Sequence, residues 1–187
     1  MPKILSDVPT HIYTDRLLLR IPQRSDGKVV NLAIRESIQE LKPWLPFVQT
    51  LPLQEETELN LESAHDKFLK KESFRFLIFT KETGEFVGVT SLQSIDWDIP
   101  KCEIGYWANS KYVGNGYMTE AVDAITKLGI HTLRFKRIEI RCESENIKSR
   151  AIPERLHFTL EGILKNEDLS ADGKRVTDTC IYAVTQH

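Results

Sequence analysis

A glycine-rich bend between a strand pattern and a helix pattern constrains this chain more than any other feature. The bend lies in the segment Tyr112-Val113-Gly114-Asn115-Gly116-Tyr117-Met118-Thr119-Glu120. The residues before it, 102–107, are typical of a half-buried strand, and after it apolar residues recur at helical spacing from Ala121 to Leu133. The first amides of a helix have no partner within the helix, and the helix dipole adds a partial positive charge there. The segment therefore predicts a site that holds a phosphate group without a lysine.

The same residues have a simpler interpretation as a hairpin turn, since Asn-Gly between two apolar runs is a strong signal for a hairpin. The period near 3.6 after the bend, rather than 2, favours a helix. Two other phosphate loops are excluded. The segment lacks the Lys-Ser or Lys-Thr that follows the second glycine of a P-loop, and it lacks the third glycine of the dinucleotide fingerprint.

Size and charge limit the classes of function. The 187 residues suit a single domain, residues 1–187, that buries about 70% of its unfolded surface. A hydrophobic fraction of 41%, a charged fraction of 28% and a net charge of -2 describe a soluble protein. Such a charge gives no attraction to nucleic acid or to an anionic membrane, so we expect neither as a partner.

The cysteines and histidines indicate a reducing compartment and no metal. Cys102, Cys142 and Cys180 are far apart in strand-like apolar runs, which suits buried thiols better than disulfides or zinc ligands. None of the five histidines pairs with another at metal-ligand spacing. Residues 1–7 lack the apolar core of a signal peptide, and no run approaches the ~18 apolar residues of a membrane helix. We expect a cytoplasmic protein.

The hydrophobic pattern predicts seven strands and about four helices. The strands are expected at 12–21, 74–80, 85–95, 102–107, 137–142, 158–164 and 176–184. The helices are expected from Ser25 or Asp26 to Ile38, at 55–71, after the glycine bend, and at 147–156. Prolines interrupt 41–48, which predicts an ordered aromatic loop. Strands and helices interleave without strict alternation, so we predict a mixed α+β sheet rather than a doubly wound fold.

In this order, the motifs resemble the GNAT superfamily of acetyl-CoA-dependent N-acetyltransferases, and most closely its ribosomal-protein N-terminal acetyltransferase (RimJ/RimL) branch. The resemblance covers nearly the whole chain. The matching motifs are at 14–20, 42–46, 86–89, 103–107, 114–121 and 143–158. It implies a twisted, mostly antiparallel seven-stranded sheet with about four helices, in which splayed central strands hold acetyl-CoA.

The resemblance also implies which residues bind acetyl-CoA, the co-substrate. The bend would wrap the pyrophosphate with the backbone amides of Val113, Gly114, Asn115, Gly116, Tyr117, Met118 and Thr119. The pantetheine arm would lie between 103–108 and 138–142, held at a bulge in the first strand by backbone groups of Tyr106, Trp107 and Ala108. Asn146 matches the family asparagine near the pantetheine, and Ser149 matches the serine beside the thioester sulfur.

Four positions depart from the family pattern. Val113 stands where the bend often opens with Gln or Arg, and Met118 where it often closes with Gly or Ala. Because backbone amides make the grip, we expect these changes to weaken binding rather than abolish it. His157 replaces a usual glycine, and Pro153 lies inside the presumed helix, about one turn in, where a missing amide costs little.

Acetyl transfer needs a neutral amine, a place for the developing oxyanion and a proton for the departing thiolate. An α-amine, with a pKa of about 7.7–8.0, loses its proton far more readily than a lysine near 10.4, so a weak carboxylate base acting through water is sufficient. Ser149 fits the proton donor, and its alternative role is a helix N-cap. Asn146 has the alternative role of a turn residue.

Three acids are candidates for the general base. By the resemblance, an acid just after the strand that follows the serine helix falls on Glu167 or Asp168, with Asp168 in the better register. Glu103 on the central strand is the third. The alternatives are that Glu167 and Asp168 form a solvated loop pair, and that Glu103 is a strand residue bonded to a neighbouring amide.

Trp44, Phe47 and Trp107 are candidates for an aromatic wall beside the acceptor amine, with core packing as the alternative. The favoured function is transfer of acetyl to the N-terminal α-amine of a protein. A small amine such as a polyamine, amino acid or aminoglycoside is the alternative acceptor. A non-catalytic acyl-CoA-binding or regulatory module, and a structural protein whose Gly-Asn-Gly is only a turn, are the other classes. A homodimer formed through the last strands is consistent with the family.

Overall fold

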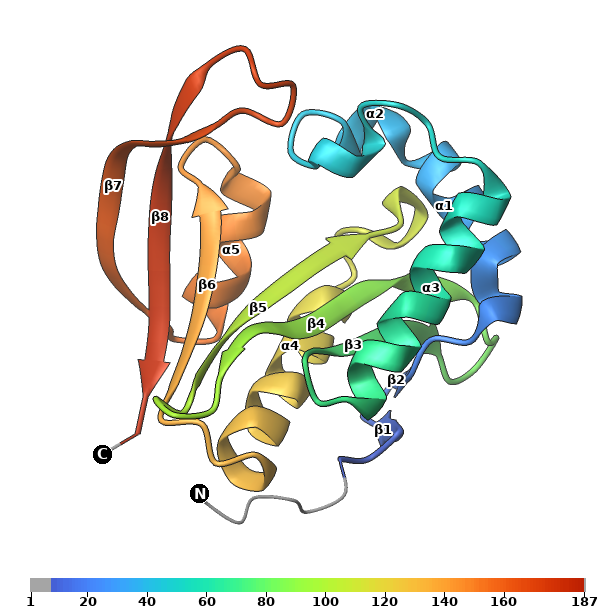
Figure 1. Ribbon diagram of the computed structural model, residues 1–187, viewed down its shortest axis with the longest axis horizontal. Coiled ribbons are helices and arrows are strands. Elements are labelled where there is room, and N and C mark those ends of the chain that lie inside the picture. Colours follow the sequence, from blue (N-terminus) through green and yellow to red (C-terminus); the bar gives the residue numbers. More distant parts are fainter. Residues whose placement is uncertain (1–7, 187) are drawn as a thin grey trace.

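The computed structural model describes residues 8–186, and their eight strands form one sheet (Figure 1). The strands are β1 (His11–Tyr13), β2 (Leu17–Arg20), β3 (Phe74–Thr80), β4 (Phe86–Asp96), β5 (Lys101–Ala108), β6 (Arg137–Glu143), β7 (Thr159–Leu169) and β8 (Val176–Thr185). Their spatial order is β1-β2-β3-β4-β5-β6-β8-β7. Only β5 and β6 pair in parallel among these strands, so the sheet is mixed and mostly antiparallel, as predicted.

Five α-helices pack on this sheet in the described part of the chain. They are α1 (Gly27–Glu36), α2 (Ile38–Leu41), α3 (Gln54–Leu69), α4 (Tyr117–Lys127) and α5 (Ile147–Arg155). Short helical turns are η1 (Arg24–Asp26), η2 (Pro46–Val48), η3 (Ser110–Tyr112) and the π-helical η4 (Leu128–Thr132). No helix within residues 8–186 is both long enough and apolar enough to span a bilayer.

The predicted number of strands was one too low, because residues 12–21 form two strands instead of one. The backbone amide of Thr14 donates to the carbonyl of Leu17 at 3.0 Å, and the Leu17 amide donates to Oγ1 of Thr14 at 3.0 Å. This turn reverses the chain, and β1 then pairs antiparallel with β2. The fifth helix is α2, which begins after Ser37 interrupts the first helix.

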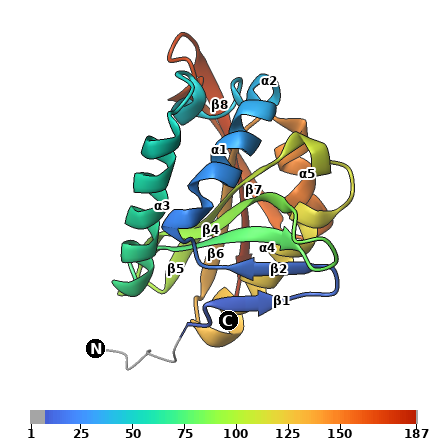
Figure 2. The same cartoon turned by 90° about the vertical axis from the view of Figure 1, so that its right-hand side faces the viewer.

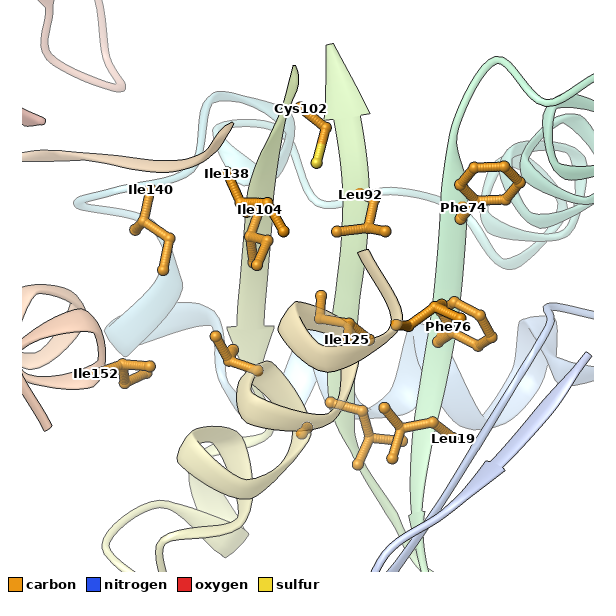
Figure 3. Packing of buried hydrophobic residues seen from close by; sticks show 14 of the residues in the cluster. Leu19, Phe74, Phe76, Leu92, Cys102, Ile104, Ile125, Ile138, Ile140 and Ile152 are labelled. Carbon is orange, nitrogen blue, oxygen red and sulfur yellow. The ribbon is translucent and has the colours of Figure 1, made fainter. Parts of the chain in front are cut away.

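The two faces of the sheet carry different cores, because successive strand residues point to opposite faces. One core packs Ala121, Val122 and Ile125 of α4 against the sheet, and Figure 3 shows Ile125 beside Phe76 and Leu92. On the other face, Leu77, Phe79 and Val89 pack against α1 and α3. Figure 2 shows α1 and α3 on one side of the sheet and α4 on the other. Each face is therefore closed by its own helices.

The sheet opens between β5 and β6, as the splayed strands of the prediction require. Their pairing is limited to Lys101↔Arg137, Cys102↔Ile138 and Glu103↔Glu139. Beyond these residues the two strands diverge into a V (Figure 1). The edge of β5 that faces β6 has no strand partner from Ile104 to Ala108 within the described residues. Backbone groups along this edge are available to a ligand.

The bulge expected within 103–108 lies instead on the neighbouring strand. Pairing of β4 with β5 is unbroken from Gly88↔Ala108 to Gln93↔Glu103, and the register shifts only between Gln93 and Asp96. Ser94, inside that irregular stretch, has a φ of 50°. The expectation was wrong because the extra residue belongs to β4, so β5 remains regular and its free edge results from the splay.

Candidate active site

The glycine bend is a helix start and not a hairpin turn. Gly114 and Gly116 have φ values of 82° and 75°, in the left-handed region that favours glycine, and α4 begins immediately after them. Both glycines are exposed. Within residues 8–186, no hydrogen bond takes up the backbone amides from Gly114 to Thr119. Six consecutive free amides at the positive end of a helix can hold an anion.

Arg16 braces this bend from the other end of the chain. Its Nη1 donates to the carbonyl of Asn115 at 2.9 Å, and its Nε donates to Oε2 of Glu120 at 2.6 Å. Thr14 donates to the same carboxylate at 2.6 Å. Burial raises the pKa of Glu120, but the hydrogen bonds from Thr14 and Arg16 outweigh it and hold the pKa below its usual range. Sequence reasoning missed this brace, because nothing local links residues about a hundred positions apart.

A cavity of about 830 Å³ lies over the opening between β5 and β6. Its lining comes from both faces of the sheet, since Glu103 and Trp107 alternate along β5 with Ile104 and Tyr106, and all four line it. The cavity brings together predicted site residues from distant parts of the chain. These are Trp44, Phe47, Glu103, Tyr106, Trp107, Asn146, Ser149, Glu167 and Asp168.

The remaining predicted cofactor residues do not line this cavity. They are Ala108, Val113, Gly114, Asn115, Gly116, Tyr117, Met118 and Thr119. Seven of these eight form the bend at the start of α4, whereas the cavity lies at the splay. The site therefore has two separate parts, an amide-lined bend and a side-chain-lined cavity, and the free edge of β5 runs between them.

Tyr106, Ser149 and Pro153 form a linked unit at the splay. Pro153 lies in the second turn of α5 and has no amide to donate to the carbonyl of Ser149, four residues earlier. The Tyr106 hydroxyl donates to that carbonyl at 2.8 Å. Oγ of Ser149 then donates to the Tyr106 oxygen at 3.3 Å. The proline thus costs little for a reason other than the predicted one, because a tyrosine replaces the missing donor.

Asn146, and not Ser149, caps α5. The side-chain oxygen of Asn146 accepts from the amide of Ser149 at 3.1 Å, which places Ser149 in the first turn and leaves its hydroxyl free of a capping role. The alternative interpretation of Ser149 as an N-cap is therefore wrong. Within the described residues, Nδ2 of Asn146 makes no hydrogen bond, and the residue lines the cavity.

Glu103 is a half-buried acid without a cationic partner. Gln93 and Ser94 donate to its carboxylate at 3.4 and 3.5 Å. Among residues 8–186, no Lys, Arg or His nitrogen lies within 4.0 Å of it. Burial raises its pKa above the usual range, with Glu139 adding to the increase and Arg141 opposing it. The expected contact with a neighbouring amide is present, yet the acid also faces the cavity.

Glu167 and Asp168 differ in how their carboxylates are engaged. Arg141 donates to Glu167 at 2.7 Å in an ion pair, whereas Oδ1 of Asp168 accepts only the amide of Leu169, at 2.7 Å, among the described residues. The expectation that both follow the strand in a loop was wrong. β7 continues through them to Leu169, past an irregular stretch in which Asn166 has a φ of 53°.

The three candidate aromatic residues all line the cavity but differ in packing. Trp107 packs edge to face on Phe86, with ring centroids 5.8 Å apart, and contacts the core under α1 and α3. Trp44 is half-buried, and Phe47 is 50% exposed. Core packing thus describes part of the role of Trp107, while Phe47 leaves half of its surface available to a ligand.

His157 occupies a position that favours glycine for a backbone reason. Its φ is 59°, and its amide donates to the carbonyl of Glu154 at 3.2 Å. The Phe158 amide donates to the carbonyl of Pro153 at 2.9 Å. These two bonds form a Schellman motif, in which the left-handed residue ends the helix. His157 therefore preserves the helix end although it departs from the family pattern, and it does not line the cavity.

The three cysteines are free and buried, as predicted. Cys142 and Cys180 are not far apart in space, because they face each other across β6 and β8. Burial raises the pKa of Cys142 to about 11, so this cavity-lining thiol stays protonated near neutral pH. In the part of the chain from 8 to 186, no three His, Cys, Asp or Glu side chains form a cluster that could hold a metal ion.

The chain is similar in sequence and in fold to known acetyltransferases. The family model of the acetyltransferase (GNAT) domain matches residues 16–159. N-acetyltransferase p20 of Bacillus licheniformis, itself uncharacterized, is 30% identical over 173 residues, or 92% of this chain and 94% of the relative. The ribosomal-protein-serine acetyltransferase of Escherichia coli K12 is 27% identical over 146 residues, or 78% of each chain.

Solved structures agree with this match. The ribosomal L7/L12 alpha-N-protein acetyltransferase RimL, in complex with coenzyme A, superposes with a TM-score of 0.85 at 25% identity. The alignment covers 95% of this chain and 97% of that one.

Proposed function

The chain belongs to the GNAT family of acetyl-CoA-dependent N-acetyltransferases, and we propose that its acceptor is the N-terminal α-amine of a protein. The observation that carries this proposal is the cavity of roughly 830 Å³, which has room for the end of a peptide chain. It is lined by Glu103 and Asp168, two acids with no cationic nitrogen within 4.0 Å among the described residues. The similarity to acetyltransferases of ribosomal proteins supports the same acceptor.

Acetyl-CoA supplies the acetyl group as a thioester, and the residues present fit its binding. The free amides from Gly114 to Thr119 are suited to its pyrophosphate, with Arg16 holding the bend in shape. The unpaired edge of β5 is suited to the pantetheine arm, because its amides and carbonyls match those of an extended amide chain. Nδ2 of Asn146 offers one further donor beside this edge.

We assign Glu103 to hold the incoming ammonium group. A carboxylate that burial has partly desolvated, with no cation within 4.0 Å in the described residues, gains from a positively charged ligand. Trp107 lies on the same face of β5 as Glu103, four positions along the strand. The rings of Trp107 and Phe47 line the same cavity, and aromatic rings attract a cation.

We assign Asp168 to take the proton of the amine through a water molecule. Its side chain is exposed and lines the cavity, so the proton can leave to solvent. Glu167 is less suited because its carboxylate is neutralised by Arg141. The amine nitrogen then bonds to the acetyl carbon as the carbon–sulfur bond breaks. The backbone amide of Tyr106, on the edge of β5 that faces away from β4, would hold the carbonyl oxygen.

We assign Ser149 to give a proton to the departing thiolate. The serine oxygen regains a proton from the nitrogen that has bonded to the acetyl carbon, which must lose one to become an amide. Its hydroxyl bonds to the Tyr106 oxygen at 3.3 Å, and burial raises the pKa of Tyr106, so that the tyrosine stays protonated near neutral pH. The Tyr106 hydroxyl remains fixed by the Ser149 carbonyl and holds the serine in place.

We propose three further features of the chain. The whole chain acts as one domain in a reducing compartment such as the cytoplasm, which three free buried thiols favour. A homodimer forms along β7, an edge strand on which Leu160, Ile163 and Leu164 are 39–43% exposed. Sedimentation velocity at two protein concentrations tests the dimer.

The acceptor is tested by a thiol-release assay with acetyl-CoA and a panel of primary amines. The panel includes hexapeptides with free N-termini, a polyamine, a free amino acid and an aminoglycoside. Turnover with peptides that exceeds turnover with the small amines at equal concentration supports the proposal. Turnover confined to a small amine contradicts the proposed acceptor, and acetyl-CoA binding without any turnover favours a non-catalytic module.

A further inference from the structure

Arg75 is a cation on the floor of the acceptor cavity that lacks an acidic partner. It lies on β3 and lines the cavity. Its Nη1 donates to Oδ1 of Asn60 on α3 at 2.6 Å. Among residues 8–186, this is the only hydrogen bond of the guanidinium, and no carboxylate lies within 4.0 Å of it. A guanidinium carries five N–H donors, so most of them remain free.

The lack of a carboxylate partner is unusual for an arginine in a half-buried position. The side chain is only partly accessible, and burial lowers its pKa with no opposing effect from a nearby acid. An arginine nonetheless keeps its charge under ordinary conditions. Seven other arginines, at positions 16, 20, 24, 137, 141, 150 and 175, have a carboxylate within 4.0 Å. The three others that have none among the described residues, at positions 35, 134 and 155, are exposed to solvent, whereas Arg75 is half-buried. The partner of Arg75 is therefore expected to come from a ligand in the cavity.

The pairing of the strands gives the place of Arg75 relative to the reaction centre. Arg75 lies opposite Ser91 on β4, and Ser91 lies opposite Gly105 on β5, so the three residues form a row on one face. Glu103 lies two positions along β5 on the same face. Neighbouring strands are about 4.8 Å apart, which places Arg75 roughly 10 Å from β5.

We propose that Arg75 binds an acidic side chain of the acceptor, so that the enzyme prefers protein N-termini with Asp or Glu at the second or third position. The floor then carries two complementary charges. Glu103 faces the ammonium group at one end, and Arg75 faces a carboxylate at the other. An extended chain advances about 3.4 Å per residue, so a side chain at position two or three reaches across the row. This inference rests on the proposed peptide acceptor.

The test compares matched peptides that differ only in one charge. Each hexapeptide with a free N-terminus carries Glu or Gln at position two, three or six, and kcat/KM is measured by thiol release. We expect Glu at position two or three to exceed Gln by about tenfold, the factor for one charge-assisted hydrogen bond, mainly through KM. We expect Glu and Gln at position six to differ by less than twofold.

Two variants then test whether Arg75 causes this preference. In Arg75→Met, which keeps the length of the side chain, the Glu/Gln ratio is expected to fall toward one. In Arg75→Glu, we expect a preference for Lys over Glu at the same position, since the Asn60 amide can turn to donate to the new carboxylate. The control is Arg24→Met, which removes an exposed arginine that pairs with Glu62 at 3.7 Å outside the cavity. It is expected to keep the wild-type ratio.

Two results overturn the inference. One is a wild-type Glu/Gln ratio near one at both positions, which needs no variant. The other is an unchanged Glu/Gln ratio in an Arg75→Met protein that still binds acetyl-CoA.

If peptides do not react and small amines do, the proposed acceptor is wrong. The same variants are then compared on an amino acid and its amide. A wild-type preference for the carboxylate that Arg75→Met abolishes then supports Arg75 as an anion site, and equal rates overturn it.

Discussion

The glycine bend and the cavity are the two ends of the candidate site, but they are built in different ways. The bend offers backbone amides from one continuous segment, Gly114 to Thr119, and its shape depends on two glycines with positive φ. The cavity offers side chains from β3, β5, β7 and α5, among others. A backbone site tolerates changes such as Val113 and Met118, whereas a side-chain site changes its chemistry with each substitution. The proposed contacts to acetyl-CoA thus depend mainly on the backbone, and the proposed contacts to the acceptor depend on side chains.

The largest expected effect lies at the cavity end. Asp168→Asn removes the proposed base but keeps the size of the side chain, so kcat is expected to fall by about 10²-fold or more. The Kd for acetyl-CoA, measured by calorimetry, is expected to change by less than twofold. Asp172→Asn, in the exposed turn after β7, is the control for loss of one carboxylate. A fall in kcat of less than threefold in Asp168→Asn contradicts the assignment.

A second effect separates acceptor binding from catalysis at the same end. Glu103→Gln removes the anion that faces the ammonium group, and KM for a peptide is expected to rise about tenfold at pH 8. Because burial raises the pKa of Glu103, the wild-type KM is expected to rise as pH falls through a value above the usual carboxyl range. The variant should lose this dependence. A KM that responds to pH equally in both proteins would exclude Glu103 from acceptor binding.

At the bend, Gly116→Val should raise the Kd for acetyl-CoA by tenfold or more, about 1.4 kcal/mol. Gly116 has a φ of 75°, which a β-branched residue adopts only with strain, and the free amides around it would turn away. Gly173→Val is the matched control, because Gly173 has a φ of 71° in the turn between β7 and β8. The control should lose similar stability and keep its Kd. An unchanged Kd in Gly116→Val refutes the pyrophosphate assignment.

A smaller effect tests the linked unit that Tyr106, Ser149 and Pro153 form at the splay. Tyr106→Phe leaves the Ser149 carbonyl without a donor, and the free energy of unfolding should fall by about 1 kcal/mol. Pro153→Ala restores an amide four residues after Ser149. In the double variant this amide should take over the carbonyl, so that the cost of Tyr106→Phe largely disappears. Urea unfolding of the four proteins gives the coupling energy, and additive effects would show that the proline and tyrosine are independent.

The smallest effect concerns the brace on the bend. Arg16→Met removes the bonds to the Asn115 carbonyl and to Glu120, but leaves the glycines and the amides in place. We expect the Kd for acetyl-CoA to rise about threefold, because exposed ion pairs contribute little. Calorimetry at two salt concentrations checks the value. A rise greater than that of Gly116→Val would mean that arginine, rather than backbone, makes the main contact.

The sequence predicted the bend better than the cavity, and the reason is physical. Glycine dihedrals and helix periodicity are local, so the helix start with free amides at 114–119 could be located from one segment. The split of 12–21 into β1 and β2 depends on hydrogen bonds made by Thr14, and the bulge on β4 depends on pairing with β5. Arg75 gave no signal in the sequence, because a single arginine in a strand pattern does not indicate a binding site. Only the structure shows that this arginine has no carboxylate partner among the described residues.

Pro153 shows that one residue type in a sequence can point to a contact with a distant part of the chain. A proline inside a helix frees a known carbonyl, here that of Ser149, and that carbonyl must find another donor. Here, however, the predicted place of Pro153, about one turn into the helix, gave no reason to look for that donor, and only the fold identifies it as Tyr106.

The most direct test of the account uses one peptide with a free α-amine and an internal lysine, incubated with the enzyme and acetyl-CoA and then sequenced by tandem mass spectrometry. We expect one acetyl group, on the α-amine, and no product from the same peptide with a blocked N-terminus. Acetylation of the lysine in both peptides would contradict it.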